Sequence, residues 1–210
     1  MRHISLIIMA GLLVASCKAP DSKKDVAPEV KPADTPVVAT VVPAPPAPVV
    51  KELKTKTGKT IVVTETHPTG ASLSTVDIRF SGDTSAAAVY ADIDPVTNIL
   101  LGDLDGNGFE EVYVFSQAAG SGSYGNIHGM ASNKDKSLSQ IYVPAVEEAD
   151  MKAGGRFEGY EGHDSFSIAG KNLKREFPIK AQGKTKRTVT YTLKAGEASW
   201  RLDALSSKAE

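Results

Sequence analysis

Apolar residues recur at every second position over most of the chain beyond residue 50. Residues 76–80 read Val-Asp-Ile-Arg-Phe, and residues 188–193 read Thr-Val-Thr-Tyr-Thr-Leu. A period of two is typical of strands that bury one face. Further runs of this kind, separated by Gly, Pro and Asn, lie at 60–66, 97–101, 111–116, 127–131, 138–143, 165–169, 173–180 and 200–202. Residues 144–152 leave room for one or two helical turns. The pattern predicts an all-β domain, an antiparallel β-sandwich with Greek-key-like connections.

The chain begins with a short basic segment and an apolar run, Ile4 to Val14. This run is too short to span a bilayer as a helix, and it fits a secretory signal peptide over residues 1–16. The sequence Val-Ala-Ser-Cys that ends at Cys17 resembles a bacterial lipobox, in which the cysteine is acylated. An ordinary export signal with an incidental thiol is the alternative. Cys17 is the single cysteine of the chain, so no intrachain disulfide forms. We expect a lipid, not a transmembrane helix, to make the membrane contact.

Residues 17–50 hold most of the 12 prolines of the chain, mixed with Ala and Val. This composition favours polyproline II, a stiff spacer that at ~3.1 Å per residue reaches up to about 100 Å. A proline-rich ligand for another domain is the alternative. Residues 51–210 are long enough for one domain with a sizeable core. The net charge of −1 and the lack of a basic stripe argue against nucleic acid as a partner.

A glycine-rich segment, Gln-Ala-Ala-Gly-Ser-Gly-Ser-Tyr-Gly-Asn, occupies residues 117–126 between two predicted strands. Glycine permits backbone angles that other residues avoid, so this segment predicts a tight hairpin loop. Such a loop would project Ser121, Ser123 and Tyr124 from the edge of a sheet, as a protein-recognition loop requires. The alternative is a plain hairpin whose Tyr124 folds back onto its own sheet.

The motif Ser121-Gly122-Ser123-Tyr124 has a characteristic context. It follows Asp-Leu-Asp-Gly-Asn-Gly-Phe-Glu-Glu-Val-Tyr-Val at 103–114 and precedes Gly-Asn-Ile-His-Gly at 125–129. The chain resembles the periplasmic inhibitors of invertebrate-type (I-type) lysozymes, which carry a Ser-Gly-x-Tyr loop on a β-sandwich. The resemblance covers about residues 51–205 and is densest over 103–143.

The resemblance implies an envelope-anchored inhibitor, with an I-type lysozyme as the favoured partner, whose loop enters the cleft of the enzyme. Ser121 would donate a hydrogen bond to a catalytic carboxylate, and Tyr124 would fill the cleft. Gly122 would allow the turn and Ser123 would add a polar contact. Supporting positions would be Gly125, Asn126 and His128. Family members can be dimeric, so a homodimer stays open. Lys18 after the lipidated cysteine favours the outer membrane, facing the periplasm or the surface.

A second cluster, Asp103, Asp105, Asn107 and Glu111, offers oxygen atoms at alternate positions of a tight loop, as calcium prefers. An EF-hand would need a glutamate at its twelfth position, which here is Val114, and the segment leads into a strand. Asp, Asn and Gly are also good turn formers. The sequence favours the turn and no bound cofactor, with these four residues as the calcium ligands in the alternative case.

Catalytic chemistry has little support in the sequence. His67, His128 and His163 lack metal-ligand spacing to one another. Ser121 with His128 and a carboxylate would make a hydrolytic triad, but no Gly-x-Ser-x-Gly elbow is present. We therefore expect no enzyme. A carbohydrate- or peptidoglycan-binding β-sandwich, with Tyr124 stacking on a sugar, is the main alternative to the inhibitor. A structural envelope lipoprotein that binds another surface protein is a third.

Overall fold

The computed structural model describes residues 44–84, 88–181, 184–197 and 199–210. The predicted signal peptide, the lipidation site Cys17 and most of the linker lie outside these residues. The strands are β1 (Val49–Lys54), β2 (Thr60–Thr66), β3 (Ser74–Phe80), β4 (Ala88–Ile93), β5 (Val96–Gly102), β6 (Glu111–Gln117), β7 (Gly125–Ser132), β8 (Leu138–Tyr142), β9 (Ser165–Ala169), β10 (Asn172–Ala181), β11 (Lys184–Ala195) and β12 (Trp200–Ala209). Helix α1 is a single turn, Glu148–Met151.

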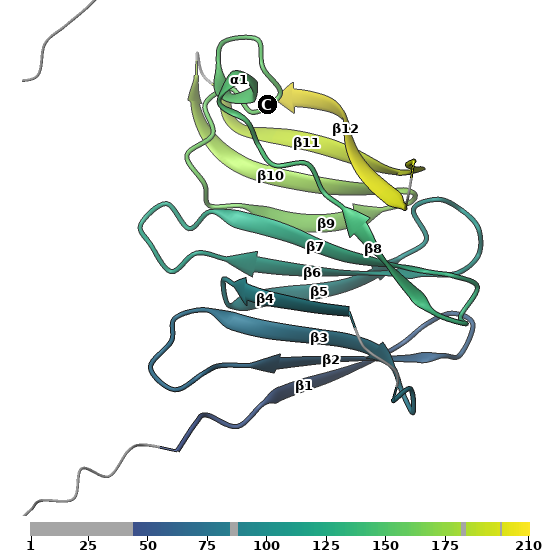
Figure 1. The fold of residues 1–210 in the computed structure, drawn as a ribbon. Helices are drawn as coiled ribbons and strands as arrows, with labels where there is room; N and C mark the ends of the chain where they lie inside the picture. The colour runs from purple at the N-terminus through teal and green to yellow at the C-terminus, as the bar shows by residue number, and fades with distance from the viewer. Residues whose placement is uncertain (1–43, 85–87, 182–183, 198) are drawn as a thin grey trace, which may run out of the picture. The chain divides into compact units, whose positions relative to one another are not determined.

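The strands form two sheets (Figure 1). One has four strands in the order β1-β2-β3-β4, and the other has eight in the order β5-β6-β7-β8-β12-β11-β10-β9. Neighbouring strands are antiparallel except β8 and β12, which run parallel where Trp200 faces Ile141. The predicted all-β sandwich is confirmed, and the alternating runs at 60–66 and 165–169 coincide with β2 and β9. Strand β1 begins at Val49, before the predicted domain boundary at Lys51.

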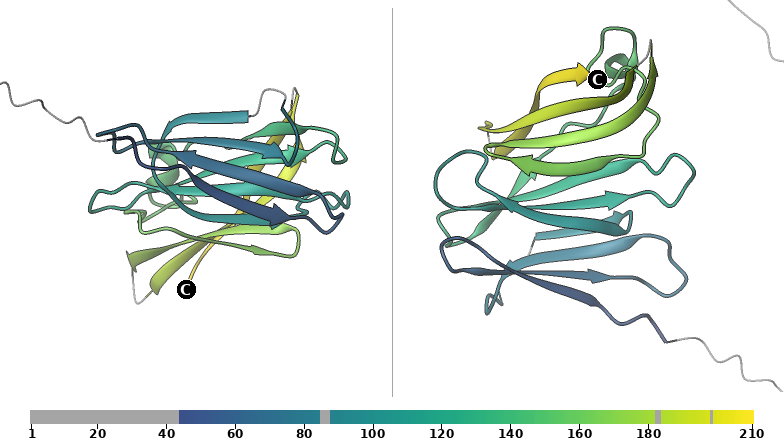
Figure 2. Two further views of the ribbon diagram at one scale, coloured as in Figure 1. Left: turned by 90° about the horizontal axis from the view of Figure 1, so that it is seen from below. Right: turned by 180° about the vertical axis from the view of Figure 1, so that it is seen from behind.

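Strand β6 lies at the centre of the packing and is buried on both faces. Val112 and Val114 point to one side and join a cluster with Ile61 and Ile78 of the four-stranded sheet. Tyr113 and the other residues of the opposite face enter a separate cluster. A strand with two buried faces reads as a continuous apolar run, which explains the sequence Val-Tyr-Val-Phe. The two further views show the four-stranded sheet beside β5 and β6 (Figure 2).

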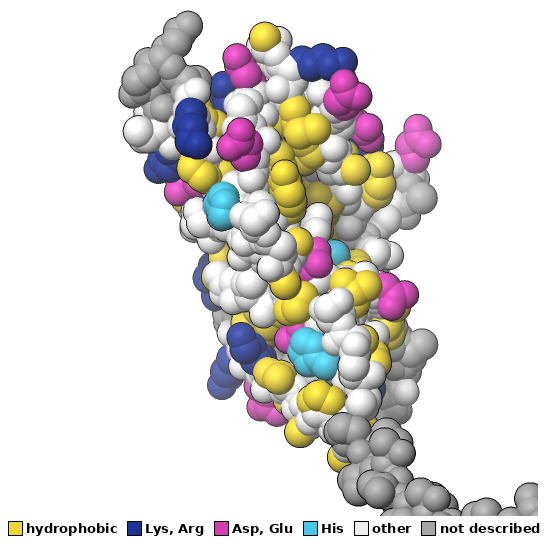
Figure 3. All heavy atoms as spheres, turned by 90° about the vertical axis from the view of Figure 1, so that its left-hand side faces the viewer, with side chains coloured by type: hydrophobic (Ala, Val, Ile, Leu, Met, Phe, Trp, Pro, Cys, Tyr) yellow, Lys and Arg dark blue, Asp and Glu magenta, His cyan; other side chains and the backbone are white. Residues whose placement is uncertain are grey.

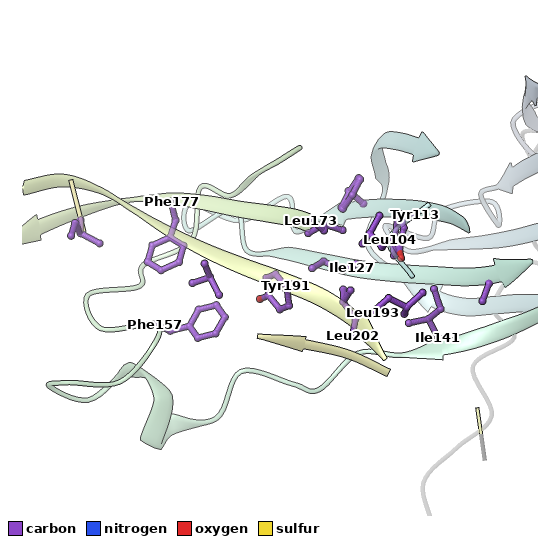
Figure 4. Packing of buried hydrophobic residues seen from close by; sticks show 14 residues of the cluster. Leu104, Tyr113, Ile127, Ile141, Phe157, Leu173, Phe177, Tyr191, Leu193 and Leu202 are labelled. Atoms are coloured by element: carbon purple, nitrogen blue, oxygen red, sulfur yellow. The ribbon is translucent and has the colours of Figure 1, made fainter. Parts of the chain in front are cut away.

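The second cluster fills the concave side of the eight-stranded sheet (Figure 4). Phe115 of β6 stacks on Phe166 of β9 with ring centroids 4.5 Å apart, so strands far apart in the sheet order meet across this core. The two edge strands also approach each other, because a Cβ on Gly102 of β5 would lie 2.8 Å from Ile168 Cδ1 of β9. The eight-stranded sheet is therefore curled almost into a barrel, with the smaller sheet against its outside.

Within the described ranges, no helix combines the length and apolar character needed to cross a bilayer.

Candidate functional site: the glycine-rich loop and its groove

The glycine-rich loop joins β6 to β7 and is fixed by its own hydrogen bonds. The Ala118 amide donates to the carbonyl of Tyr124 at 3.0 Å, and the Ser123 amide donates to the carbonyl of Gly120 at 2.9 Å. Gln117 Nε2 donates to the carbonyl of Ser123 at 2.9 Å. Ser123 has a φ of 43°, a left-handed conformation that is uncommon for residues other than glycine. The loop is a defined turn in which these backbone groups hold the chain together.

A second segment, residues 159–164 before β9, lies directly against this turn. The His163 amide donates to the carbonyl of Gly122 at 2.9 Å. Gly162 has a φ of 88°, and a Cβ at this position would lie 1.8 Å from the Gly122 carbonyl oxygen. Only glycine fits both the backbone angle and this close approach. The motif loop is therefore supported from outside its own hairpin.

Beneath both segments lies a buried ion pair between Asp164 and Arg175 of β10. Arg175 Nε donates to Asp164 Oδ1 at 2.6 Å, and the two side chains are 6% and 0% exposed. Asp164 Oδ2 accepts from the Gly125 amide at 2.7 Å and from the Tyr160 hydroxyl at 2.6 Å. Arg175 Nη2 donates to the Gly125 carbonyl at 2.9 Å and also to the Tyr160 hydroxyl. The pair thus clamps both backbone polar groups of the first residue of β7, immediately after the motif.

The guanidinium of Arg175 stays charged in this setting. Burial by itself lowers the pKa of Arg175, but the hydrogen bond and the negative charge of Asp164 outweigh burial and raise it. The guanidinium carbon also lies 4.8 Å from the ring centroid of Tyr160, which favours the cation further. For the neutral phenol of Tyr160, burial acts in the other direction and raises the pKa. Both side-chain partners of Asp164, Arg175 and Tyr160, therefore keep their protons across the physiological pH range.

Tyr124 is 51% exposed and lies at the end of the loop, next to the first residue of β7. The edge of its ring meets the Tyr160 ring at a centroid distance of 5.6 Å, and a Cβ on Gly122 would lie 2.4 Å from its Cε2 atom. One side of the phenol ring is thus seated on the protein while the other is accessible. Ser121 is exposed, whereas the Ser123 hydroxyl donates to the Gly120 carbonyl inside the loop.

The residues after the motif take different positions. Gly125 is buried in the clamp, and Asn126 is exposed, with its Nδ2 donating to Asp94 at 3.3 Å. His128 Nε2 lies 3.0 Å from the hydroxyl oxygen of Ser116, and its ring contacts Tyr90 at 4.9 Å. Both contacts are with neighbouring strands. Among the described residues no hydrogen bond joins His128 to Ser121, so the hydrolytic pair considered from the sequence is not formed. Burial lowers the pKa of His128, against an opposing effect of Asp94.

A groove of about 780 Å³ opens beside the motif. Its lining includes five tyrosine side chains from separate segments, Tyr90, Tyr124, Tyr142, Tyr160 and Tyr191. Pairing between β7 and β8 begins only at Gly129, so residues 125–128 form a strand edge along this groove. Figure 3 views the end of the molecule that carries the β6–β7 loop. Hydrophobic and uncharged side chains intermingle over its middle, and Lys and Arg lie toward its margins.

The acidic residues lie at the opposite end of β6 from the motif. Carboxylate oxygens of Asp103, Asp105 and Glu111 come together within 4.8 Å of one another. Asn107 does not join them: its Oδ1 accepts from the Phe109 amide at 2.7 Å, and its Nδ2 donates to Asp105 at 2.7 Å. Three of the four predicted metal candidates are therefore grouped, and the fourth holds the turn.

Comparison of the chain with protein-family models, with curated proteins and with solved structures found no match.

Sequence reasoning missed that support. Arg175 stands in Leu-Lys-Arg-Glu-Phe-Pro-Ile at 173–179, where every second residue is buried. The alternation places Arg175 on the inward face with Leu173 and Phe177, and a buried arginine requires an acidic partner. The signal was thus present for Arg175. For Asp164 and Tyr160, in a loop rich in glycine, the sequence carries no comparable signal.

Proposed function

We propose that this protein is a lysozyme inhibitor that inserts the Ser121–Tyr124 loop into the active-site cleft of the enzyme. The observation that supports it best is a rigid, externally braced turn that presents an exposed serine hydroxyl and a half-exposed phenol. The resemblance of the motif to inhibitors of I-type lysozymes makes that enzyme type the favoured target. In this proposal the protein is a binding protein without catalytic activity of its own.

The chemistry of the target fits such a loop. Glycosidases hold two carboxyl groups roughly 5–9.5 Å apart around the scissile bond. Hydroxyl donors satisfy these carboxylates without offering a bond that the enzyme can cleave. A hydrogen bond from a hydroxyl to a carboxylate contributes about 1.5–3 kcal/mol. We assign this contact to Ser121 and the filling of the cleft to Tyr124, because Ser123 already donates within the loop.

Rigidity increases the affinity of such a loop. Ordering a flexible side chain on binding costs about 0.5–1.5 kcal/mol, and ordering loop backbone costs more. Here the clamp of Arg175, Asp164 and Gly125 holds the turn before any partner arrives. The Tyr124 ring is also seated on Tyr160, which limits its rotamers. The loop therefore loses little conformational freedom when it binds.

The location of the protein belongs to the same proposal. A signal peptide, a lipid on Cys17 and a proline-rich spacer would tether the domain to the cell envelope, with the outer membrane favoured. From there the inhibitor would protect peptidoglycan from an incoming lysozyme. Labelling of the producing bacterium with a radioactive fatty acid should mark the protein, and Cys17→Ser should abolish the label.

Cell-wall lysis tests the function directly. The full-length protein should block lysis by an I-type lysozyme, and Tyr124→Ala should weaken the block at least tenfold, as the loss of a buried aromatic anchor does. Full inhibition by the alanine variant removes Tyr124 from the mechanism. If the wild-type protein inhibits neither I-type lysozyme nor the other animal types of lysozyme, the proposal that it is a lysozyme inhibitor is wrong.

A carbohydrate-binding role is the second candidate, favoured by the tyrosine-lined groove. Tyr142 is 58% exposed and Tyr124 51% exposed at its rim, and aromatic faces are suited to stacking on sugar rings. Calorimetric titration with peptidoglycan fragments discriminates the two roles: saturable heat with fragments but no inhibition of lysozyme supports the binding module.

A further inference from the structure

The turn between β5 and β6 gathers three acidic side chains around one point. Carboxylate oxygens of Asp103, Asp105 and Glu111 all lie within 4.8 Å of one another. Calcium binds its oxygen ligands at about 2.3–2.6 Å, so oxygens on opposite sides of one ion are about 5 Å apart. The observed spacing is therefore that of a single coordination sphere.

A buried, unpartnered carboxylate oxygen points to a ligand independently of this spacing. Glu111 is fully buried. Its Oε2 accepts from the Leu104 amide at 2.8 Å, whereas its Oε1 has no hydrogen-bond partner among the described residues. Asp103 likewise has one hydrogen-bonded and one unbonded carboxylate oxygen. Its Oδ2 accepts from the Gly108 amide at 3.0 Å, and its buried Oδ1 has no hydrogen-bond partner among the described residues. Buried polar atoms are nearly always satisfied, so two orphan oxygens in one cluster require an explanation.

The electrostatics of the cluster support the same conclusion. Like charges brought this close in a partly dry site repel one another and favour a bound cation. A cationic side chain beside the turn is the exposed Lys171, whose Nζ lies 1.8 Å from the place a Cβ on Gly106 would occupy. No ion pair within 4.0 Å joins Lys171 to the three carboxylates in the described structure.

We propose that Asp103, Asp105 and Glu111 bind one divalent cation, calcium by preference, which fastens the β5–β6 turn. The donors are all oxygens, which suits a hard cation and not zinc. The turn is already shaped for it, because the Asn107 amide donates to Asp105 Oδ1 at 2.9 Å and Gly106 has a φ of 75°. Three carboxylates leave positions of the 6–8 coordinate calcium sphere that other oxygen atoms would have to fill. Asn107 is a turn former here and not a ligand.

The cation would stabilise the core and not the proposed binding loop. Glu111 is the first residue of β6 and Gln117 is the last, so the cluster and the motif loop lie at opposite ends of one strand. Binding of the ion connects β5 and β6 at the place where both cores meet. The proposal therefore stands or falls independently of lysozyme inhibition.

Thermal unfolding of the full-length protein with calcium tests the proposal. After dialysis against EGTA, calcium at about 100 times its Kd should raise Tm by about 5–10 °C. Glu111→Gln keeps the size of the side chain and the acceptor for Leu104 but removes the charge. This variant should lose the calcium shift, while its Tm without calcium should equal or exceed that of the wild-type protein. The matched control Glu52→Gln, on an exposed acid of β1, should keep the full shift.

Terbium luminescence gives a readout that does not depend on a variant that folds. The Tyr113 hydroxyl lies 3.5 Å from Glu111 Oε2, close enough to sensitise a lanthanide bound at the cluster. Excitation of tyrosine should produce terbium emission that calcium displaces and magnesium displaces only at higher concentration. A wild-type Tm that does not change with calcium, or terbium emission that calcium leaves unchanged, overturns the proposal.

Discussion

Replacement of Asp164 by alanine is the sharpest perturbation of the support under the motif loop. The change removes the acceptor of three hydrogen bonds, from Arg175 Nε, the Tyr160 hydroxyl and the Gly125 amide. Arg175 is left buried, at 5% exposure, without a countercharge. The Gly125 amide loses its side-chain partner at the point where the motif enters β7.

The size of the effect follows from burial. Removal of one partner from a buried ion pair costs about 3–5 kcal/mol, chiefly because the other charge stays desolvated. In a domain of this size each kcal/mol lowers Tm by about 2–4 °C. We therefore expect Asp164→Ala to lower Tm by about 6–20 °C. The loop should also lose rigidity, so inhibition should weaken at temperatures at which the variant is still folded.

Chemical denaturation with a double-mutant cycle measures this cost. Arg175→Met in the Asp164→Ala background removes the stranded charge and should recover more than 1 kcal/mol of stability. The exposed pair of Arg201 and Asp203 provides the control, since Asp203→Ala should cost less than about 1 kcal/mol. A cost below about 1 kcal/mol for Asp164→Ala, or no recovery in the double variant, refutes the reasoning that the clamp is a strong buried pair.

Two further predictions concern the neighbourhood of the loop. Gly162→Ala adds a Cβ 1.8 Å from the Gly122 carbonyl oxygen at a φ of 88°. It should therefore lower the free energy of unfolding in urea by about 1–3 kcal/mol. The control Gly70→Ala has a positive φ but open space around it, so it measures the cost of the backbone angle alone. Burial lowers the pKa of His128, against an opposing effect of Asp94, so the unfolded chain takes up a proton first as pH falls below about 6.5. The contribution of His128 to the free energy of unfolding should be fully present above that pH, and stability should fall by up to about 1.4 kcal/mol per pH unit below it. His128→Gln should flatten this part of the stability profile. A profile that the substitution leaves unchanged contradicts a lowered pKa of His128.

The alternation of apolar and polar residues predicted most of the strands but not β1 and β4. It predicted β2 and β9 with their observed bounds because β2 buries one face only and β9 covers one face more than the other. Strand β1 begins inside the expected linker, and all but one of its residues are exposed, so it has no clear apolar face. Strand β4, Ala-Val-Tyr-Ala-Asp-Ile, has a similarly weak pattern and exposes Val89. Edge strands of this kind are specified by their partners more than by their own sequence.

Only part of the candidate site could be predicted from the sequence. The glycine content between two strands predicts the motif loop but leaves open whether Tyr124 is exposed or folds back onto its sheet. The clamp joins residues 39 and 50 positions apart in the chain. Such contacts depend on the curl of the eight-stranded sheet, which no local pattern encodes. The acidic turn illustrates the same limit. Its four oxygen-bearing residues are visible in the sequence, but burial of Glu111 and the separate role of Asn107 depend on packing.

The affinity of the full-length protein for an I-type lysozyme, measured by calorimetry with two matched tyrosine variants, tests the central claim most directly. Tyr124 and Tyr142 are both about half exposed at the groove, but only Tyr124 belongs to the motif loop. The account predicts that Tyr124→Ala raises Kd at least tenfold and that Tyr142→Ala changes it less than threefold. Equal affinities for the wild-type protein and Tyr124→Ala, or no binding by the wild-type protein, would contradict it.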